Sequence, residues 1–381
     1  MAAMSHPSSS AAFAAPELPV LPVLDRTSLR VLSGKLQDGE PLPAEIIRHV
    51  VAVAGAAPSV FNTQPWLFRS DGFVLDLFAD RERLLHRGDP AGRQLVISCG
   101  AAAHHAALAL RGLGRDAQIQ LLPDPNDPDH LVRLIPGPYI CEMPTPDQWA
   151  WLHAIGDRHS YRAALQPRRL SRQLVVELQE AAALEGCGLR PVERPGERAD
   201  LAELLIRANT RLSVDAAARD ELFAWSRWED ESDAPIVDGI PRAVVPPATP
   251  VTRNAHFQQR DFDVDGSVGG ASGASGADES GTGEDPDIAA LWTPGDTAND
   301  WLLAGFALSA VLLAATCAGA SASLLNQPLE EPVMRTRVQA AMRVAGPVQL
   351  VLRLGYSERH QPQRATPRRP VADILTLTSV N

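Results

Sequence analysis

The decapeptide from residue 57 to residue 66 carries the densest group of side chains that could bind a ligand. It reads Ala-Pro-Ser-Val-Phe-Asn-Thr-Gln-Pro-Trp and places Ser59, Asn62 and Gln64 between two prolines. The prolines restrict the backbone, so these short polar groups are held in a near-rigid turn. Such a turn could read a flat polar edge with one N–H between two carbonyls, like the pyrimidine side of a flavin. The alternative is a helix-to-strand loop whose Asn and Gln satisfy the chain's own backbone.

A second segment, Arg158-His-Ser-Tyr-Arg162, combines two guanidinium groups with a hydroxyl group between them. This combination suits a phosphate, because arginine forks bind phosphate oxygens in pairs. One arginine could instead face the N1–C2=O side of a flavin, where reduction leaves negative charge. Arg368 and Arg369, flanked by prolines, form a further basic pair near the C-terminus. The alternative for both segments is a solvated stretch with scattered charges.

Other kinds of site are not supported by the sequence. His104 and His105 are adjacent, so they cannot share a helix face as metal ligands at i and i+4 do. The Gly112-Leu-Gly114 pattern is better explained as the end of a helix than as a dinucleotide fingerprint. We find no pairing of a nucleophile with a base. We therefore predict no metal site and no catalytic side chain.

The elements that must position these residues occur twice in the chain. Two glycine-bounded, alanine-rich runs, 100–114 and 305–319, each continue for nine residues to a proline. The offset is constant at 205 residues (Gly100 to Gly305, Gly114 to Gly319, Pro123 to Pro328). We predict an α+β fold made of two related units, each with a central helix buried on nearly all faces.

The repeat divides the chain into five expected parts. A second-half insertion begins acidic and becomes rich in Gly and Ser from 266 to 283, where too little apolar surface is present to order the backbone. Because it interrupts a unit instead of joining two, we expect it to form a lid. The parts are a disordered tail (1–24), the first half (25–145), the second half (146–228 and 287–381, including a C-terminal tail) and the insertion (229–286).

Composition excludes several classes of protein. The 381 residues carry a net charge of −11, which argues against a nucleic-acid partner. Four cysteines without a CxxC pair fit a reducing cytoplasm. The uncharged stretch 301–327 is long enough to span a membrane, but its counterpart contains His104, His105 and Arg111. We therefore expect a cytoplasmic protein with two soluble core helices and no membrane span.

In their order and spacing, these segments resemble the nitroreductase superfamily of FMN proteins. The greatest similarity is to its Acg-type branch, in which two nitroreductase units are fused in one chain. The resemblance covers roughly residues 40–375. Besides 57–66 and 158–162, it rests on Asp89–Ala101, Asp238–Pro241, Asp300–Gly305, Asn326–Glu330 and Gly346–Gly355.

The resemblance implies which residues hold a flavin. In ordinary members of the family, two subunits share each FMN: one supplies Arg-x-Ser and C-terminal basic residues, the other the Pro-Ser-x-x-Asn-x-Gln-Pro-Trp segment. The second half of this chain lacks that segment, so a monomer acting as a pseudo-dimer should keep one site. The implied cofactor-binding residues are Arg158, His159, Ser160, Arg162, Pro58, Ser59, Asn62, Gln64, Asn326, Gln327, Arg368 and Arg369.

The function implied by the resemblance is that of an FMN-dependent oxidoreductase. NAD(P)H would reduce the flavin, which would pass electrons to a small quinone- or nitro-type acceptor. The alternative is a lidded flavin-binding or FMN-storage protein with little or no turnover. A third, weaker alternative is a relative that has lost its flavin.

Overall fold

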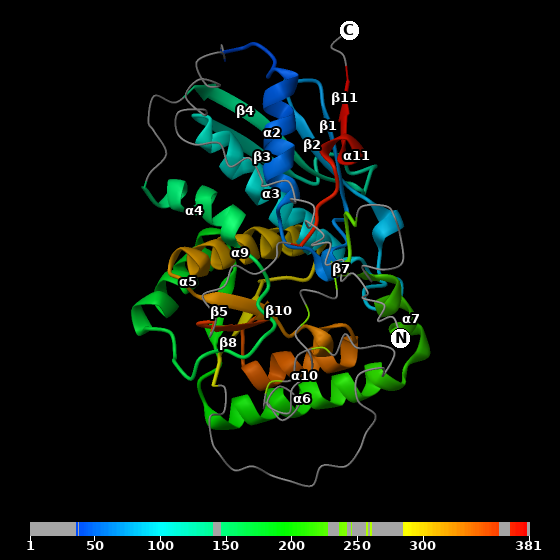
Figure 1. Cartoon of the computed structure of the whole chain (residues 1–381), viewed down its shortest axis with the longest axis vertical. Coiled ribbons are helices and arrows are strands. Elements are labelled where there is room, and N and C mark those ends of the chain that lie inside the picture. The colour runs from blue at the N-terminus through cyan, green and yellow to red at the C-terminus, as the bar shows by residue number, and fades with distance from the viewer. Residues whose placement is uncertain are drawn as a thin grey trace, which may run out of the picture.

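The computed structural model describes residues 36, 38–139, 146–227, 236–241, 245, 257, 260, 285–357 and 366–378. The expected N-terminal tail (1–24) and the Gly/Ser-rich segment (266–283) lie outside this part. The fold is α+β, as predicted: a five-stranded and a four-stranded sheet are each packed against helices. Figure 1 shows the first sheet in the upper part of the molecule and the second in the lower part, with α9 crossing between them.

The first unit is built around a sheet in the order β11-β1-β2-β4-β3. Alternate residues of β1 are buried, with Trp66 and Phe68 inside and Arg69 exposed, which is the pattern of a strand with one covered face. The covering helices contribute much of the core, including Ile46, Val50 and half of the residues of α3. The elements are α2 (Ala44–Gly55), η1 (Val60–Asn62), β1 (Trp66–Ser70), β2 (Leu75–Ala79), η2 (Arg81–Arg83), α3 (Arg93–Gly112), β3 (Arg115–Leu121) and β4 (His130–Tyr139).

The second unit repeats the first. Its sheet has the order β5-β8-β10-β9, which matches β1-β2-β4-β3 strand for strand, and α5 and α9 stand where α2 and α3 stand in the first unit. Its elements are α4 (Pro146–Asp157), α5 (Arg172–Leu184), β5 (Gly188–Pro191), α6 (Pro195–Val214), α7 (Ala216–Ala224), β6 (Ser226–Arg227), β7 (Ile240–Pro241), β8 (Asp287–Trp292), α9 (Ala298–Cys317), β9 (Ser321–Leu324), η4 (Gln327–Leu329), α10 (Pro332–Met342) and β10 (Val348–Gly355).

The added segment of the second unit is longer than the sequence indicates. In the first unit, β1 connects to β2 through residues 71–74, whereas residues 192–286 separate the equivalent strands β5 and β8. This connection contains α6, α7, β6 and β7, so it begins at 192 and not at 229. Helices α6 and α7 have ordinary composition, and nothing in their sequence distinguishes them from elements of the repeated unit.

The central helices α3 and α9 cross at a point where neither tolerates a side chain. A Cβ atom on Gly100 would lie 2.3 Å from the carbonyl oxygen of Leu302, and one on Gly305 would lie 2.1 Å from that of Ile97. Leu302 is the counterpart of Ile97 at the same offset of 205 residues. Such a reciprocal contact is what a two-fold axis produces. The chain is therefore a pseudo-dimer whose axis passes between the two glycines.

Helix α9 has the length and composition of a membrane-spanning helix, but 67% of its apolar window is buried inside the fold. It packs against α3 and α5 in the cores of both units. His104 of α3 is held by a polar partner across this interface, since its Nδ1 atom lies 2.8 Å from the Ser309 hydroxyl. These two residues are again 205 positions apart. The apolar character of α9 is thus accounted for by burial between the two units.

The C-terminus returns to the first unit. After α11 (Val371–Ile374), strand β11 (Leu375–Leu377) pairs in parallel with β1, with Leu375 opposite Phe68. Figure 1 shows this last strand, in red, beside the blue β1. The crossing places the basic residues before α11 next to the turn before β1.

Candidate functional site

The turn that precedes β1 is strained. Phe61, Asn62 and Gln64 have φ values of 46°, 55° and 50°, a left-handed region that costs a residue with a side chain of order 1–3 kcal/mol. The Ser59 hydroxyl offsets part of this cost by accepting a hydrogen bond from the backbone N–H of Gln64 at 3.0 Å. Pro58 is buried beneath the turn. Strain of this kind is common at binding sites, where surrounding contacts hold it in place.

The amide side chains of Asn62 and Gln64 are bonded to other parts of the chain. Asn62 Nδ2 donates to the carbonyls of Gly239 (2.9 Å) and Pro367 (3.1 Å). Gln64 Nε2 donates to Val237 O (2.9 Å), and its Oε1 accepts from a backbone N–H of the C-terminal segment at 2.8 Å. This corresponds to the alternative in which the amides satisfy the backbone. The two side chains join three segments around the site, and a direct contact with a cofactor stays a prediction for them.

Of the predicted arginines, Arg368 is bonded to this turn, and Arg158 acts electrostatically on Arg368. Arg158 follows α4, and Arg368 precedes α11. Arg368 NH1 donates to Asn62 Oδ1 at 3.1 Å, and its NH2 donates to Ala56 O at 3.2 Å. In the described part of the chain, the Nε atoms of both arginines are buried without a hydrogen-bond partner, and neither guanidinium forms an ion pair with a carboxylate. We call Arg158 and Arg368 the arginine pair.

The electrostatics of the arginine pair favour an anion. Burial lowers the pKa of Arg158 to about 10. Burial, with a smaller contribution from Arg158, lowers the pKa of Arg368 to about 9. Both shifts mean that the surroundings oppose these positive charges, and although both side chains are partly exposed, a charge that is largely desolvated and lacks a counter-charge is costly. A bound anion would relieve that cost.

Arg369 differs from its neighbour. Its guanidinium pairs with Asp80 at 3.1 Å, with both side chains about nine-tenths buried, and donates to the Gln64 carbonyl at 3.1 Å. Its charge is therefore already compensated. Of the two C-terminal arginines, Arg368 is the one on which Arg158 acts electrostatically.

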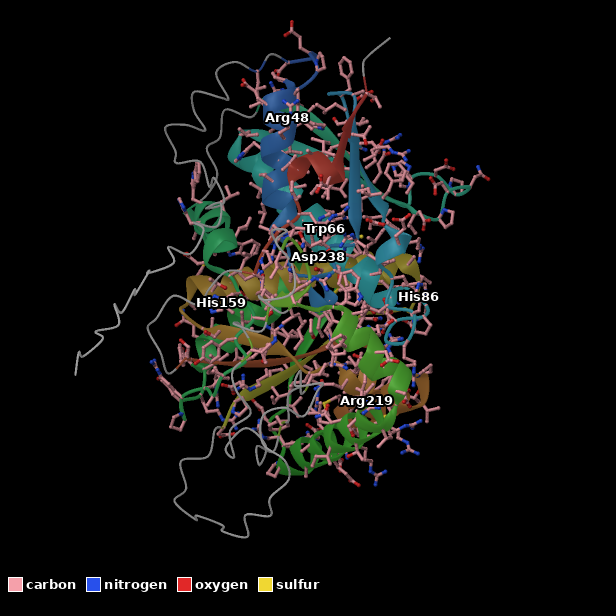
Figure 2. All side chains as sticks on the ribbon, turned by 45° about the vertical axis from the view of Figure 1, so that its right-hand side comes forward. Arg48, Trp66, His86, His159, Arg219 and Asp238 are labelled. Carbon is pink, nitrogen blue, oxygen red and sulfur yellow. The ribbon has the colours of Figure 1, made fainter. Side chains whose placement is uncertain are left out.

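Within the 158–162 segment, Ser160 and Tyr161 are held against β9. Ser160 forms a parallel bridge with Ala322, whose carbonyl accepts from the Tyr161 N–H at 2.8 Å. Burial lowers the pKa of Arg162 to about 10. His159 Nδ1 is bonded to Asp157 O at 2.9 Å. In Figure 2, His159 lies apart from Trp66 and Asp238, toward the edge of the molecule.

The predicted loop at Asn326 and Gln327 lies on the second unit. Asn326 Oδ1 accepts from the Val351 N–H of β10 at 3.1 Å, and Gln327 is buried. The loop is linked to the turn through Arg260, which pairs with Glu330 and lies 5.1 Å from the centre of the Phe61 ring.

The segment 237–239, here called the strap, was not among the predicted site residues. Besides the two amide contacts described above, the Gly239 N–H donates to the Asn62 carbonyl at 3.2 Å. Asp238 accepts from Arg83 NH1 at 2.7 Å and from Arg227 NH2 at 2.6 Å. In Figure 2, Asp238 and Trp66 are both labelled in the middle part of the molecule. The Asp238-Gly239 pair is a turn signal in the sequence, and Gly239 adopts a φ of 72° in the structure.

His105 is not among the predicted cofactor-binding residues, and the sequence argues only against its being a metal ligand. It is fully buried in α3, and its Nε2 atom has no partner in the described part of the chain. A polar residue on a helix predicted to be buried on all faces is itself a signal, because buried polar groups need a reason.

Two solved structures to which the chain is similar in part are nitroreductases with bound FMN. One, from Bacteroides fragilis NCTC 9343, is 14% identical, covers 57% of this chain and 94% of its own, and has a TM-score of 0.33. The other, from Desulfitobacterium hafniense DCB-2, is 13% identical, covers 60% and 98%, and has a TM-score of 0.34. Each spans little more than half of this chain. No family model matches the sequence.

Curated relatives match over most of the length. "Putative NAD(P)H nitroreductase acg" of Mycobacterium tuberculosis is 28% identical over 344 residues, 87% of this chain and 95% of that protein. "Putative NAD(P)H nitroreductase Rv3131" of the same organism is 33% identical over 336 residues, 87% of this chain and 91% of that protein. With this identity over nearly the whole of a relative, and with the duplicated α+β architecture, the chain belongs to the nitroreductase family, in its Acg-type branch.

Proposed function

We propose that this chain is an FMN-dependent oxidoreductase of the nitroreductase type, which takes electrons from NAD(P)H and passes them to a small quinone- or nitro-type acceptor. The observation that carries the proposal is the arginine pair: two guanidiniums with buried Nε atoms and no carboxylate partner in the described chain. The names of the relatives and the FMN in the similar structures support the same reading.

The residues present fit the phosphate group of FMN. A phosphate dianion would supply the counter-charge that the arginine pair lacks, and charge-assisted bonds from Arg to phosphate are among the strong ones in proteins. We assign Arg158, Arg368 and the Ser160 hydroxyl to the phosphate. We assign Arg162 to the N1–C2=O side of the ring, and the backbone at Asn326 and Gln327 to a ring contact. The turn at 58–64 closes the site from the first unit.

When bound, FMN supplies the hydride and electron transfer between nicotinamide and acceptor. The chain's own residues bind the flavin, orient it and shield it from water. A fixed cation at Arg162 favours negative charge on the ring edge near it, and such preorganised charge acts strongly where water is excluded. The bonds from Asn62 and Gln64 to the strap hold the turn in its strained form. No side-chain acid or base is assigned, and the reaction needs none from the protein.

The first expected result is one FMN per chain. The turn comes from the first unit and Arg158 from the second, and the sequence lacks a good copy of either in the opposite unit. A visible absorption spectrum of the purified protein, with flavin released and counted against protein, measures this ratio. A colourless protein that takes up no added FMN would overturn the proposed function. Two flavins per chain would contradict the assignment of a single site.

A second candidate function is supported by the strap. Because residues 237–239 are bonded to Asn62 and Gln64, and Asp238 to Arg83 and Arg227, the strap is fastened directly to the turn. If the strap and the insertion around it bar the nicotinamide, the chain would hold flavin with little or no turnover.

Stopped-flow reduction separates the two functions. We expect NADH or NADPH to bleach the bound flavin rapidly in the intact protein, and Asp238→Asn to change this rate by less than about twofold. The storage alternative requires slow bleaching that Asp238→Asn accelerates by about tenfold or more, since both ion pairs are weakened. Glu203→Gln serves as control, because it removes the partner of Arg207 in an exposed ion pair on α6.

The pH dependence of the strap is expected to be flat in the working range. Partial burial acts to raise the pKa of Asp238, but the hydrogen bonds from Arg83 and Arg227 outweigh it and hold this pKa below its ordinary value. Its contribution to stability is thus present above the unfolded pKa of about 4 and is lost only as the pH falls through the lower folded value. Bleaching rates measured from pH 5 to 9 should therefore show no step due to Asp238.

A further inference from the structure

His105 lies where its ring can complete the arginine pair. Its side chain is fully buried, and its Nδ1 atom lies 3.3 Å from the carbonyl oxygen of Val53 near the end of α2. A carbonyl only accepts, so Nδ1 carries the proton, and in the neutral ring Nε2 presents a lone pair. That Nε2 atom has no partner in the described part of the chain.

Arg368 and His105 are held at the same end of α2. Arg368 NH2 is bonded to the Ala56 carbonyl, three residues beyond Val53, so the imidazole and the guanidinium are anchored at the same helix end. The negative end of the α2 dipole favours cations there. Arg158 and Arg368 both act electrostatically on His105, as does His104 on its own helix. His105, Arg158 and Arg368 each carry one buried nitrogen without a partner in the described part of the chain, and both arginines act electrostatically on His105.

We propose that His105 is the third side chain of the phosphate site, and that its Nε2 takes up a proton from solvent when the phosphate dianion binds. The proposal rests on the proposed function, since it assigns the dianion to the arginine pair. In the phosphate-free protein, two guanidiniums oppose a third positive charge. With the dianion in place, the pair is neutralised, and a protonated Nε2 donates a further charge-assisted bond to a phosphate oxygen.

The sign of the pH effect follows from the charges. When no phosphate is bound, the pKa of His105 lies well below its ordinary value. The main cause is burial, and smaller contributions come from the charges of His104, Arg158 and Arg368. A dianion beside the ring raises this pKa. At a pH between the pKa of His105 in the phosphate-free protein and its pKa in the complex, binding takes up as much as one proton. In that range the Kd for FMN rises by as much as about tenfold for each unit that the pH increases. Phosphate monoesters lose their second proton near pH 6, so the effect is measured at pH 7 to 8.5.

Proton uptake is measured by isothermal titration calorimetry. The full chain, stripped of flavin, is titrated with FMN at pH 7.5 in buffers of different ionisation enthalpy, and the dependence of the observed heat on the buffer gives the number of protons taken up. We expect wild type to take up between about half and one proton. Riboflavin, which lacks the phosphate, should bind with no uptake.

The adjacent histidines supply a matched pair of variants. His105→Gln can still donate to the Val53 carbonyl but cannot become charged, so proton uptake should vanish and the Kd for FMN should weaken by about tenfold. His104→Gln alters a buried histidine one residue away, whose ring contacts Ser309 and Phe306 of α9 instead. We expect it to keep the uptake of wild type.

The outcomes separate the two proposals. Wild type that binds FMN without taking up a proton, equal uptake with riboflavin, or undiminished uptake by His105→Gln overturns the role of His105 and leaves the flavin function standing. Wild type that binds no FMN overturns the proposed function, and with it this inference. The riboflavin comparison uses wild type only, so the test does not depend on either variant folding.

Discussion

Arg158→Met is expected to bind FMN about a hundredfold more weakly or worse, and yet to unfold at a higher temperature than wild type when no flavin is present. The loss of affinity follows from removing charge-assisted bonds to the phosphate, each worth roughly 1.5–3 kcal/mol. The gain in stability follows because Arg158 has a buried Nε atom without a partner and no carboxylate partner in the described chain. An apolar side chain of similar length removes that cost.

The matched variant is Arg369→Met, which is expected to lower the stability of the flavin-free protein instead of raising it. Arg369 is paired with Asp80 in a buried position, so its removal leaves a carboxylate without a counter-charge and costs about 3–5 kcal/mol. Thermal melts of flavin-free protein and fluorescence titrations with FMN measure both variants. Adding Ser160→Ala to Arg158→Ala should release the flavin outright. A lower melting temperature for flavin-free Arg158→Met would mean that Arg158 stabilises the fold and is not held ready for an anion.

The contrast between Arg368 and Arg369 illustrates what the sequence could not settle. Both are arginines between prolines, and the resemblance treats them alike. Their roles diverge because adjacent residues in an extended segment point to opposite sides. One side chain thereby reaches Asp80, and the other meets Asn62. Which partner each arginine meets depends on the tertiary structure, and it cannot be predicted from residue type or spacing.

The partners of the Asn62 and Gln64 side chains could not be predicted from the sequence either. Residue types predicted a rigid polar turn, and the strained φ values of Asn62 and Gln64 agree with that. Whether such amides face a ligand or the backbone depends on where carbonyl groups lie, and those of Val237, Gly239 and Pro367 come from segments far along the chain. The structure places their donors on these carbonyls.

The duplicated architecture, by contrast, could be read from the sequence because its central contact is made by glycine. Close approach of two helices demands the smallest residue at the crossing point, so Gly100 and Gly305 mark the same position in both copies. The order of the strands could not be predicted from the sequence in the same way, because any segment with alternating apolar residues can pair with several others. The start of the added segment at 192 was missed for a related reason: α6 and α7 look like elements of any α+β unit.

Gly305→Ala is expected to destabilise the protein by about 3 kcal/mol or more and to lower its melting temperature by about 6 °C or more. The added Cβ would lie 2.1 Å from the Ile97 carbonyl oxygen and 2.7 Å from the Gly100 Cα. Both are backbone atoms of α3, so no side chain can rotate away and the two helices must separate. Gly100→Ala should behave alike, because its Cβ would meet the Leu302 carbonyl at 2.3 Å.

Gly196→Ala provides the control. A Cβ at this position in the first turn of α6 meets nothing within 4 Å, so the substitution should leave the melting temperature unchanged or raise it slightly. Thermal melts of the three variants, with FMN titrations of those that fold, complete the measurement. Because the turn belongs to the first unit and Arg158 to the second, separating α3 from α9 should weaken FMN binding as well. Full flavin affinity in a Gly305→Ala protein of lowered stability would show that the site does not depend on the pseudo-dimer interface.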